Sequence, residues 1–167
     1  MGKLMHMAIQ ADFKQALSCW ASGVSVITAE ANGLKHGVTV SSFSSLSLDP
    51  PLILFCLNDK SRLLPMIDDA KGFAVNILAK HQGDVSGHFA SPNREPAEHF
   101  GDIEIDGEAS GDHPVLVGAS AHLQCVLHNK LSEGDHTIIV GRVVAATGRE
   151  DAAPLVYFRR GYRDLSS

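Results

Sequence analysis

Residues 37–59 read GVTVSSFSSLSLDPPLILFCLND, and the rest of the chain is organised around them. The stretch begins as a strand at residues 37–40, continues through five serines between Ser41 and Ser47, and turns at Pro50-Pro51. A second strand, predicted at residues 52–57, is apolar on both faces, which is typical of a buried strand. Core packing alone does not explain five hydroxyls between two such strands. Hydroxyls beside a hydrophobic wall suit a polar ligand, and we interpret the stretch as part of a site for a ligand that carries a phosphate.

Length and composition predict one globular domain with a core of its own. The chain has 167 residues, of which 44% are hydrophobic and 20% charged, and its formal net charge is −5. No basic stripe is present, so nucleic acid is not an expected partner. No apolar run approaches the roughly 20 residues that span a bilayer, so no membrane association is expected. The first ten residues lack the apolar core of a secretory signal, and we expect a cytoplasmic protein.

Hydrophobic alternation and turn signals predict a mainly β, antiparallel fold. About seven strands are expected, joined mostly as hairpins, with two or three peripheral helices. The strongest hairpin signal is Asn32-Gly33, and Glu133-Gly134-Asp135 marks another between strands predicted at residues 121–131 and 137–146. Regular turns of this kind favour a closed antiparallel barrel, because closure removes exposed strand edges.

An N-terminal helix is predicted to begin at Asp12, which forms a capping box with Gln15. Its apolar face is expected to pack into the core through residues such as Phe13 and Trp20. Residues 91–101 are rich in proline and polar side chains and predict a surface loop. The three cysteines lie in apolar segments and are expected to be buried, reduced thiols: Cys19, Cys56 and Cys125.

Residues beyond the serines could complete a nucleotide site. The G-x-G-x-x-G and P-loop motifs are both absent, so any nucleotide must be held by other groups. Ser61 and Arg62 stand at the predicted start of a helix, whose positive end and guanidinium suit a phosphate. The same pattern equally fits an ordinary N-cap serine beside a solvated edge. His136 follows a turn and opens a strand, where it could contact a planar ligand or simply lie at the surface.

Two classes of chemistry are disfavoured by what the sequence lacks. The nine histidines form no H-E-x-x-H motif, and the three cysteines lack the spacing typical of a metal site. We therefore expect no metal. No G-x-S-x-G nucleophile elbow is present, and the serine-rich stretch has no evident partnered base. Hydrolase chemistry is therefore not expected.

Four blocks of the chain resemble the short-chain flavin reductases, which are the flavin reductase components of two-component monooxygenases. The blocks are FKQALSCWASGVSVIT at 13–28, GVTVSSFSSLSLDPP at 37–51, FAVNILAKHQGDVSGHFA at 73–90, and GDHTIIVGRV at 134–143 with PLVYFRRGY at 154–162. The resemblance implies an FMN-binding split β-barrel, antiparallel and Greek-key-like, with two or three peripheral helices. We expect this flavin reductase-like domain at residues 11–165, after a short N-terminal tail at 1–10. The family works as a homodimer, with the flavin near the subunit interface.

The resemblance also implies a reaction. The expected activity is NAD(P)H-dependent reduction of free FMN or FAD, with NADH or NADPH as the hydride donor. The expected partner is a flavin-dependent monooxygenase that receives the reduced flavin. Ser42 stands where alanine or asparagine is frequent in the family, and Ser44 stands where threonine is frequent. These departures leave the choice between FMN and FAD open.

Roles for individual residues follow from the same resemblance. The isoalloxazine ring and ribityl chain would be lined by Thr39, Val40, Ser41 and Ser42, with Cys56 close to the ring. The phosphate end would be held by Ser47, Ser61 and Arg62. His136 would contact the nicotinamide nucleotide as the catalytic residue, and Tyr162 would lie in the same pocket.

Two other functions fit the sequence. A flavin- or haem-binding split-barrel module could sense or store a cofactor without catalysis, because a fold does not fix a function. A pyridoxamine-phosphate-oxidase-like flavoenzyme would need a basic pocket for its substrate's phosphate. Arg159, Arg160 and Arg163 could supply that pocket, although the same arginines suit a solvated C-terminal tail.

Overall fold

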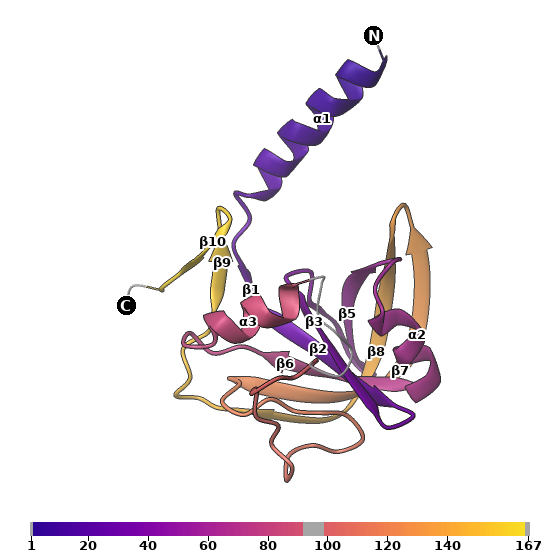
Figure 1. Ribbon diagram of the computed structural model, residues 1–167, viewed down its shortest axis with the longest axis vertical. Helices are drawn as coiled ribbons and strands as arrows, with labels where there is room; N and C mark the ends of the chain where they lie inside the picture. The colour runs from indigo at the N-terminus through magenta and orange to yellow at the C-terminus, as the bar shows by residue number, and fades with distance from the viewer. Residues whose placement is uncertain (1, 92–98, 166–167) are drawn as a thin grey trace.

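The computed structural model describes residues 2–91 and 99–165 (Figure 1). It shows a mainly β protein with three helices in the described residues: α1 Gly2–Leu17, α2 Leu63–Ala70 and α3 Gly83–Ala90. The strands are β1 Ser22–Gly23, β2 Ser25–Ala31, β3 Leu34–Val40, β4 Ser44–Leu48, β5 Pro51–Asn58, β6 Gly72–Ile77, β7 Ala121–Glu133, β8 His136–Gly148, β9 Val156–Phe158 and β10 Gly161–Arg163. These ten strands exceed the seven predicted, because β1, β9 and β10 are only two or three residues long.

Two antiparallel sheets form the fold. The large sheet has seven strands in the order β3-β2-β6-β7-β8-β5-β4, and the small one has the order β1-β9-β10. The large sheet curves, so that the tips of β7 and β8 rise beside β5 and α2 (Figure 1). Its end strands are β3 and β4, and the described residues show no ladder that joins them. The antiparallel prediction is confirmed, whereas the predicted closed ladder is not observed.

The main core lies inside the curve of the large sheet, under α2. Along β5 every second side chain points inward, and Phe55 and Leu57 are almost fully buried. The Phe55 and Phe73 rings meet edge to face at 5.0 Å, a favourable aromatic geometry. Leu63 and Ile67, one turn apart on α2, bury their side chains in the same cluster. This packing holds α2 directly after the end of β5.

Gly141 on β8 marks where the core is tightest. A Cβ atom there would lie 2.4 Å from Phe73 Cζ and 3.2 Å from Cys125 Cβ. Because overpacking forces neighbours out of their rotamers, we expect Gly141→Ala to lower the free energy of unfolding by about 1–3 kcal/mol. Gly87→Ala is the matched control, since nothing lies within 4 Å of its Cβ position in α3. Urea denaturation of both variants measures the difference, and equal stabilities would contradict the close packing.

Both predicted hairpins are confirmed. Asn32 and Gly33 have φ values of 54° and 74° between β2 and β3, the left-handed pair that a two-residue turn requires. Gly134 has φ 66° between β7 and β8. The β7–β8 hairpin is longer than predicted, with 13 residues in each strand. Its polar, exposed tip masks the strand pattern in the sequence, because neither face there is buried.

The predicted N-terminal helix is wrong in its start and in its packing. The helix begins at Gly2 rather than at Asp12, so the capping box does not form an N-terminus. It extends away from both sheets (Figure 1), and its last turn, at Lys14 and Leu17, borders a cavity together with Tyr157 of β9. Phe13 and Trp20 are therefore 61% and 75% exposed instead of lying in the core. Amphipathic periodicity identifies an apolar face but not what covers it.

The cysteine prediction is correct for one residue of three. Cys125 is buried, and burial raises the pKa of its thiol to about 12. Cys19 is exposed, because it directly follows the projecting α1, and Cys56 is half-buried. All three are free thiols, as expected.

Two segments differ from their predicted form, and a third falls largely outside the described residues. The second half of the serine run, for which no strand is predicted, forms the edge strand β4 and pairs with β5. Residues 159 and 160 form the tight turn of the β9–β10 hairpin rather than a solvated tail, with φ values of 49° and 60°. The surface loop predicted at 91–101 falls mostly on residues 92–98, which lie outside the described residues.

Candidate functional site

The ends of three strands and the start of α2 surround one cavity, which we call the central groove. Asn58 at the end of β5 is the ladder partner of His136 at the start of β8, so these two strand ends lie side by side. The chain leaving β3 passes next to them. The cavity measures about 350 Å³. It is lined by Val38, Thr39, Val40, Ser41, Ser42, Cys56, Leu57, Asn58, Ser61 and His136.

Ser42 fixes one wall of the central groove. Its hydroxyl accepts a hydrogen bond from the Cys56 backbone N–H at 3.0 Å and can donate to the Cys56 carbonyl at 3.3 Å. This pair of contacts holds the chain after β3 against β5. The Thr39 hydroxyl is also engaged, because it donates to the Ser86 carbonyl of α3 at 2.8 Å. Both side chains therefore shape the wall, and Ser41 adds an exposed hydroxyl next to them.

The opposite wall is the turn between β5 and α2. Ser61 N–H donates to the Asn58 carbonyl at 2.8 Å, and the Ser61 hydroxyl accepts from Leu63 N–H at 3.3 Å. Ser61 thus caps an early amide of α2, as the N-cap alternative from the sequence predicts. Arg62 follows in helical conformation at the helix start. This placement puts a guanidinium and the positive end of a helix beside the groove.

A second cavity, which we call the α2 cavity, continues the central groove past Ser61. It measures about 290 Å³ and shares Val38, Asn58 and Ser61 with the groove. Lys60 and Arg62 add two cations to its lining. The remaining lining residues are His36, Phe89, Ala90, Ser91 and His99.

Two buried histidines close the far side of the α2 cavity. The Nδ1 atoms of His36 and His99 lie 2.9 Å apart, so one ring donates and the other accepts. Both residues are nearly inaccessible, at 5% and 7% exposure. His88 on α3 adds a contact of 2.9 Å between its Nε2 and the His99 carbonyl. The pair joins β3 to the chain after α3 and keeps this wall in place.

A third cavity, which we call the basic cavity, adjoins the groove on the other side. It measures about 680 Å³ and shares Ser41 and Ser42 with the central groove. Three cations and two aromatic rings line it, and none of its lining residues is acidic. They are Lys14, Arg159, Arg160, Trp20 and Tyr157, together with Leu17, Ser18 and Ser22.

His136 stands at the mouth of the groove with its ring oriented by its neighbour. Its Nδ1 lies 2.7 Å from Asp135 Oδ1, and the side chain is 47% exposed. This hydrogen bond is the main cause that lowers the pKa of the Asp135 carboxyl below its ordinary value. With Nδ1–H donating to Asp135, Nε2 is the ring nitrogen left for a ligand.

Most of the residues predicted from the sequence come together. The central groove gathers seven of them: Thr39, Val40, Ser41, Ser42, Cys56, Ser61 and His136. Arg62 lines the adjoining α2 cavity. Ser47 does not meet Ser61 in either cavity, because it pairs with Leu52 in the ladder between β4 and β5. Tyr162 lies on β10, with its ring 5.9 Å from that of Tyr157, and does not line the groove.

Several lining residues were not predicted. Asn58 ends a buried strand, and a polar residue at a strand end is a signal in the sequence that could have identified it as a site residue. Lys14 and Trp20 could not be found by pattern, because their place beside the groove depends on the position of α1. His36 and His99 are 63 residues apart, so no local spacing reveals their contact.

Comparison with known proteins matches this arrangement to one family. Residues 17–166 match the model of the flavin reductase like domain. The chain belongs to the flavin reductase-like family. The reductase component of 4-hydroxyphenylacetate 3-monooxygenase from Thermus thermophilus is 40% identical over 92% of this chain and 95% of its own. An NADH-dependent FMN reductase from Streptomyces nodosus is 36% identical over 92% of this chain and 84% of its own.

Solved flavin reductases share the fold. The NADH:FAD oxidoreductase SgcE6 of Streptomyces globisporus, solved with NAD and FAD fragments, has a TM-score of 0.86 and 30% identity. The alignment covers 94% of this chain and 93% of that one. Flavin reductase PheA2 has a TM-score of 0.84 and 35% identity, over 93% and 97% of the two chains.

Two further observations concern the described residues alone. Nowhere in residues 2–91 and 99–165 do three or more His, Cys, Asp or Glu side chains form a group that could hold a metal ion. None of the described helices has the length and hydropathy that a membrane-spanning helix requires.

Proposed function

We propose that this protein reduces free FMN or FAD with NADH or NADPH and supplies the reduced flavin to a partner monooxygenase. The observation that carries the proposal is the central groove, where apolar and hydroxyl-bearing residues of β3 and β5 meet the histidine of the Gly134-Asp135-His136 turn. The relatives support it, since two of them are an NADH-dependent FMN reductase and an NADH:FAD oxidoreductase. A third is named as the reductase component of a monooxygenase.

The lining of the groove fits a flavin. Val38, Val40 and Leu57 offer apolar surface for a planar ring, and Cys56 lies between the apolar and polar parts. Ser41 and Asn58 provide neutral hydrogen-bonding groups on the two sides. Beyond them, Ser61 and Arg62 at the α2 start suit a phosphate. Neutral donors in the groove, with cations only at its end, fit moderate affinity and release of the product.

The reaction asks little chemistry of the protein itself. When bound, the nicotinamide and the flavin supply the hydride donor and acceptor, as cofactors do in such reactions. The chain's own residues bind and orient the two molecules. His136 offers Nε2 to the nicotinamide nucleotide, while Asp135 holds the imidazole in one orientation. Ser42 keeps the groove wall rigid, which limits the reactants to productive geometries.

The basic cavity extends the central groove beyond Ser41 and Ser42. Its three cations and two aromatic rings, adjoining Ser41 and Ser42, suit the diphosphate and adenine of a dinucleotide. Tyr162 would act through Tyr157, with which it packs, rather than by lining the groove itself. This cavity supports a site in which two nucleotides lie in one continuous channel.

Several finer features belong to the same proposal. The curved seven-stranded sheet would be the family's split β-barrel, and residues 11–165 would form the catalytic domain after the N-terminal segment 1–10. The active form would be a homodimer with the flavin near the subunit interface. The exposed apolar face of α1, which ends beside the basic cavity, supports a second subunit there. Ser47 at the phosphate end and a cytoplasmic location stay predictions from the sequence.

An anaerobic assay tests the proposed activity. The purified protein is mixed with each pair of FMN or FAD and NADH or NADPH, and the flavin absorbance is followed under nitrogen. Catalytic bleaching with at least one pair is expected. Absence of turnover with all four pairs would overturn the proposal, and tightly retained cofactor with no NADH oxidation would instead indicate a storage or sensor module. Oxidation of pyridoxamine phosphate without nicotinamide would favour the oxidase alternative.

A further inference from the structure

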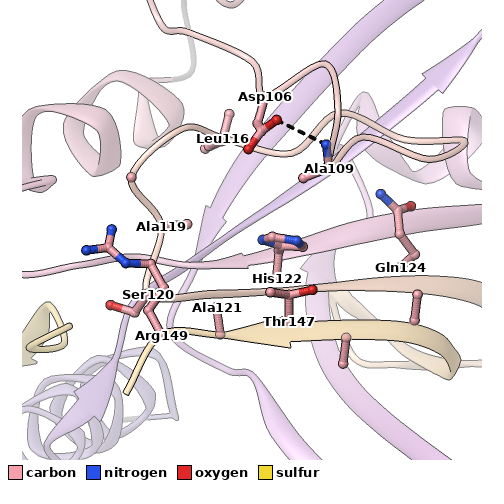
Figure 2. Close-up of a pocket in the computed structure, with 13 residues that line it drawn as sticks. Asp106, Ala109, Leu116, Ala119, Ser120, Ala121, His122, Gln124, Thr147 and Arg149 are labelled. Carbon is pink, nitrogen blue, oxygen red and sulfur yellow. Dashed lines mark hydrogen bonds between the residues drawn. The ribbon is translucent and has the colours of Figure 1, made fainter. Parts of the chain in front are cut away.

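A separate cavity lies at the other end of the β7–β8 hairpin from the central groove. It measures about 420 Å³, within the usual range for small-molecule sites. Its base is formed where β7 begins and β8 ends, and His122 there is the ladder partner of Thr147. Figure 2 shows the loop that carries Asp106 and Ala109 above these strands. The same strand β8 begins at His136 in the groove, so the two sites are separated by about 35 Å of extended chain.

Much of the lining of this cavity is small and apolar. Six of its lining residues are glycine or alanine: Ala109, Gly118, Ala119, Ala121, Ala145 and Ala146. Side chains this small leave backbone and methyl surface open to a ligand. Leu116, which is 2% exposed, adds a packed apolar boundary. A flat body can lie close against such a surface, because few side-chain atoms project from these residues.

The polar groups of the cavity differ between its two sides. Asp106 lies on the upper loop, where its Oδ1 accepts hydrogen bonds from Glu108 N–H at 3.1 Å and Ala109 N–H at 3.0 Å. Arg149 lies at another side, beyond His122 and Ala121 in the view of Figure 2. One side of the cavity therefore presents the fixed carboxylate of Asp106, and the other presents the guanidinium of Arg149. The imidazole of His122 lies between these two groups.

The local contact of Arg149 does not prevent it from binding a ligand. Its Nη2 lies 3.6 Å from Asp151 Oδ2, and both side chains are more than half exposed. Exposed pairs of this kind contribute only about 0–1 kcal/mol. The backbone of Arg149 is fixed, since its N–H donates to the Ser120 carbonyl at 2.8 Å. The guanidinium can therefore turn toward a carboxylate from a firmly held base.

Two buried polar atoms also lie on lining residues of this cavity. Ser120 Oγ and Gln124 Oε1 have no hydrogen-bond partner among the described residues, although their side chains are over nine-tenths buried. The Gln124 amide is held in place, because its Nε2 donates to the His113 carbonyl at 2.9 Å. A buried polar atom without a partner costs about 1–3 kcal/mol. Rotation of the Ser120 hydroxyl toward a molecule bound in the cavity would offset that cost for this residue.

We propose that this cavity is a second ligand site, which binds a small, flat carboxylic acid with a hydrogen-bond donor at its opposite end. Arg149 and His122 receive the carboxylate, the alanine surface packs against the flat body, and Asp106 accepts from the donor. The site is independent of the flavin groove and of the proposed reductase activity. Binding involves no covalent step.

Isothermal titration with 4-aminobenzoate tests the site. This probe has a carboxylate, a flat ring and an amine donor, and a Kd of about 1 mM or tighter is expected for a molecule of its size. Benzoate lacks the donor, and aniline lacks the anion. Each is expected to bind about tenfold more weakly, since one hydrogen-bonded end is lost. Equal affinity for all three probes would overturn the assignment of the two ends.

Matched variants locate the binding. Arg149→Gln is expected to weaken 4-aminobenzoate about tenfold or more, because a charge-assisted hydrogen bond is lost. Arg142→Gln, the same change on β8 outside the cavity, should leave the Kd unchanged. Ala145→Leu should abolish binding by filling the cavity, whereas Val144→Leu on the neighbouring position should not. Unchanged binding in Arg149→Gln or Ala145→Leu would overturn the proposal.

NMR separates this site from the flavin groove. Amide shifts caused by 4-aminobenzoate are expected at His122, Ala145 and Arg149, and not at His136. Saturating FMN should leave the affinity for 4-aminobenzoate unchanged. Displacement of the probe by FMN would place it in the groove and overturn the inference. Because the readout is binding, the result stands whether or not flavin reduction is observed.

Discussion

His136→Ala is expected to raise the KM for NADH about tenfold while the Kd for flavin stays nearly unchanged. The imidazole lies at the mouth of the groove, 47% exposed, with Nδ1 held by Asp135 and Nε2 left for a ligand. Loss of one hydrogen bond of about 0.5–1.5 kcal/mol corresponds to a change of up to about tenfold. The residues of β3 and β5 that would face the flavin line the groove with side chains of their own.

Steady-state kinetics and flavin titration measure the two effects separately. His128→Ala is the matched control, because His128 lies on β7 outside all three cavities of the site, and its KM should equal that of the wild type. Asp135→Asn should cause a smaller increase in KM, since the ring remains but its orientation is less strongly fixed. An unaltered KM in His136→Ala would remove this residue from the nicotinamide site.

The double variant Ser61→Ala with Arg62→Ala is expected to weaken FMN binding about 100-fold. A guanidinium and a hydroxyl at the start of α2 would together contribute about 2–4 kcal/mol to binding a phosphate, mostly through the charged group. The KM for NADH should change much less. Intact FMN binding in this variant would reject the phosphate assignment.

Riboflavin is the decisive control for that variant, because it has the ring and ribityl chain but no phosphate. Its affinity should be the same for the double variant and the wild type. Ser61→Ala alone also removes a cap from Leu63 N–H, which costs about 1 kcal/mol of stability. Thermal unfolding of the single variant therefore checks that α2 is intact. Ser47→Ala, measured in parallel, tests whether that serine on β4 takes part.

The sequence predicts most of the sheet, because its signals are local. Asn32-Gly33 and Gly134 specify left-handed turns, and the strands on either side follow from them. The failures concern contacts that have no local signature. Trp20 follows a helix with an apolar face, but that face is exposed instead of packing into the core. The short strands β9 and β10 also escape prediction, since three residues carry no periodicity.

The residues of the candidate site show the same difference between local signals and contacts without a local signature. Predicted residues that leave or begin a strand at one end of the sheet lie together in the groove, because strand ends that pair are neighbours, as Asn58 and His136 are. Ser47 belongs to the same serine run as Ser41, but it lies on β4 and does not line the groove. A bulge between Ser45 and Ser47 shifts the register there, which no count of serines reveals. The resemblance to a family supplied the roles, and physical pattern alone left them open.

The double contact between Ser42 and the Cys56 backbone has a consequence for how a ligand is received. It ties the segment after β3 to a central strand, so that this segment opens only together with the sheet. Its amide hydrogens should therefore exchange with solvent as slowly as those of β5, although the segment borders an open channel. A loop ordered in advance loses little conformational entropy when a flavin arrives. Binding and release of the flavin can then both be rapid, which suits a reductase that must release its reduced flavin after every turnover.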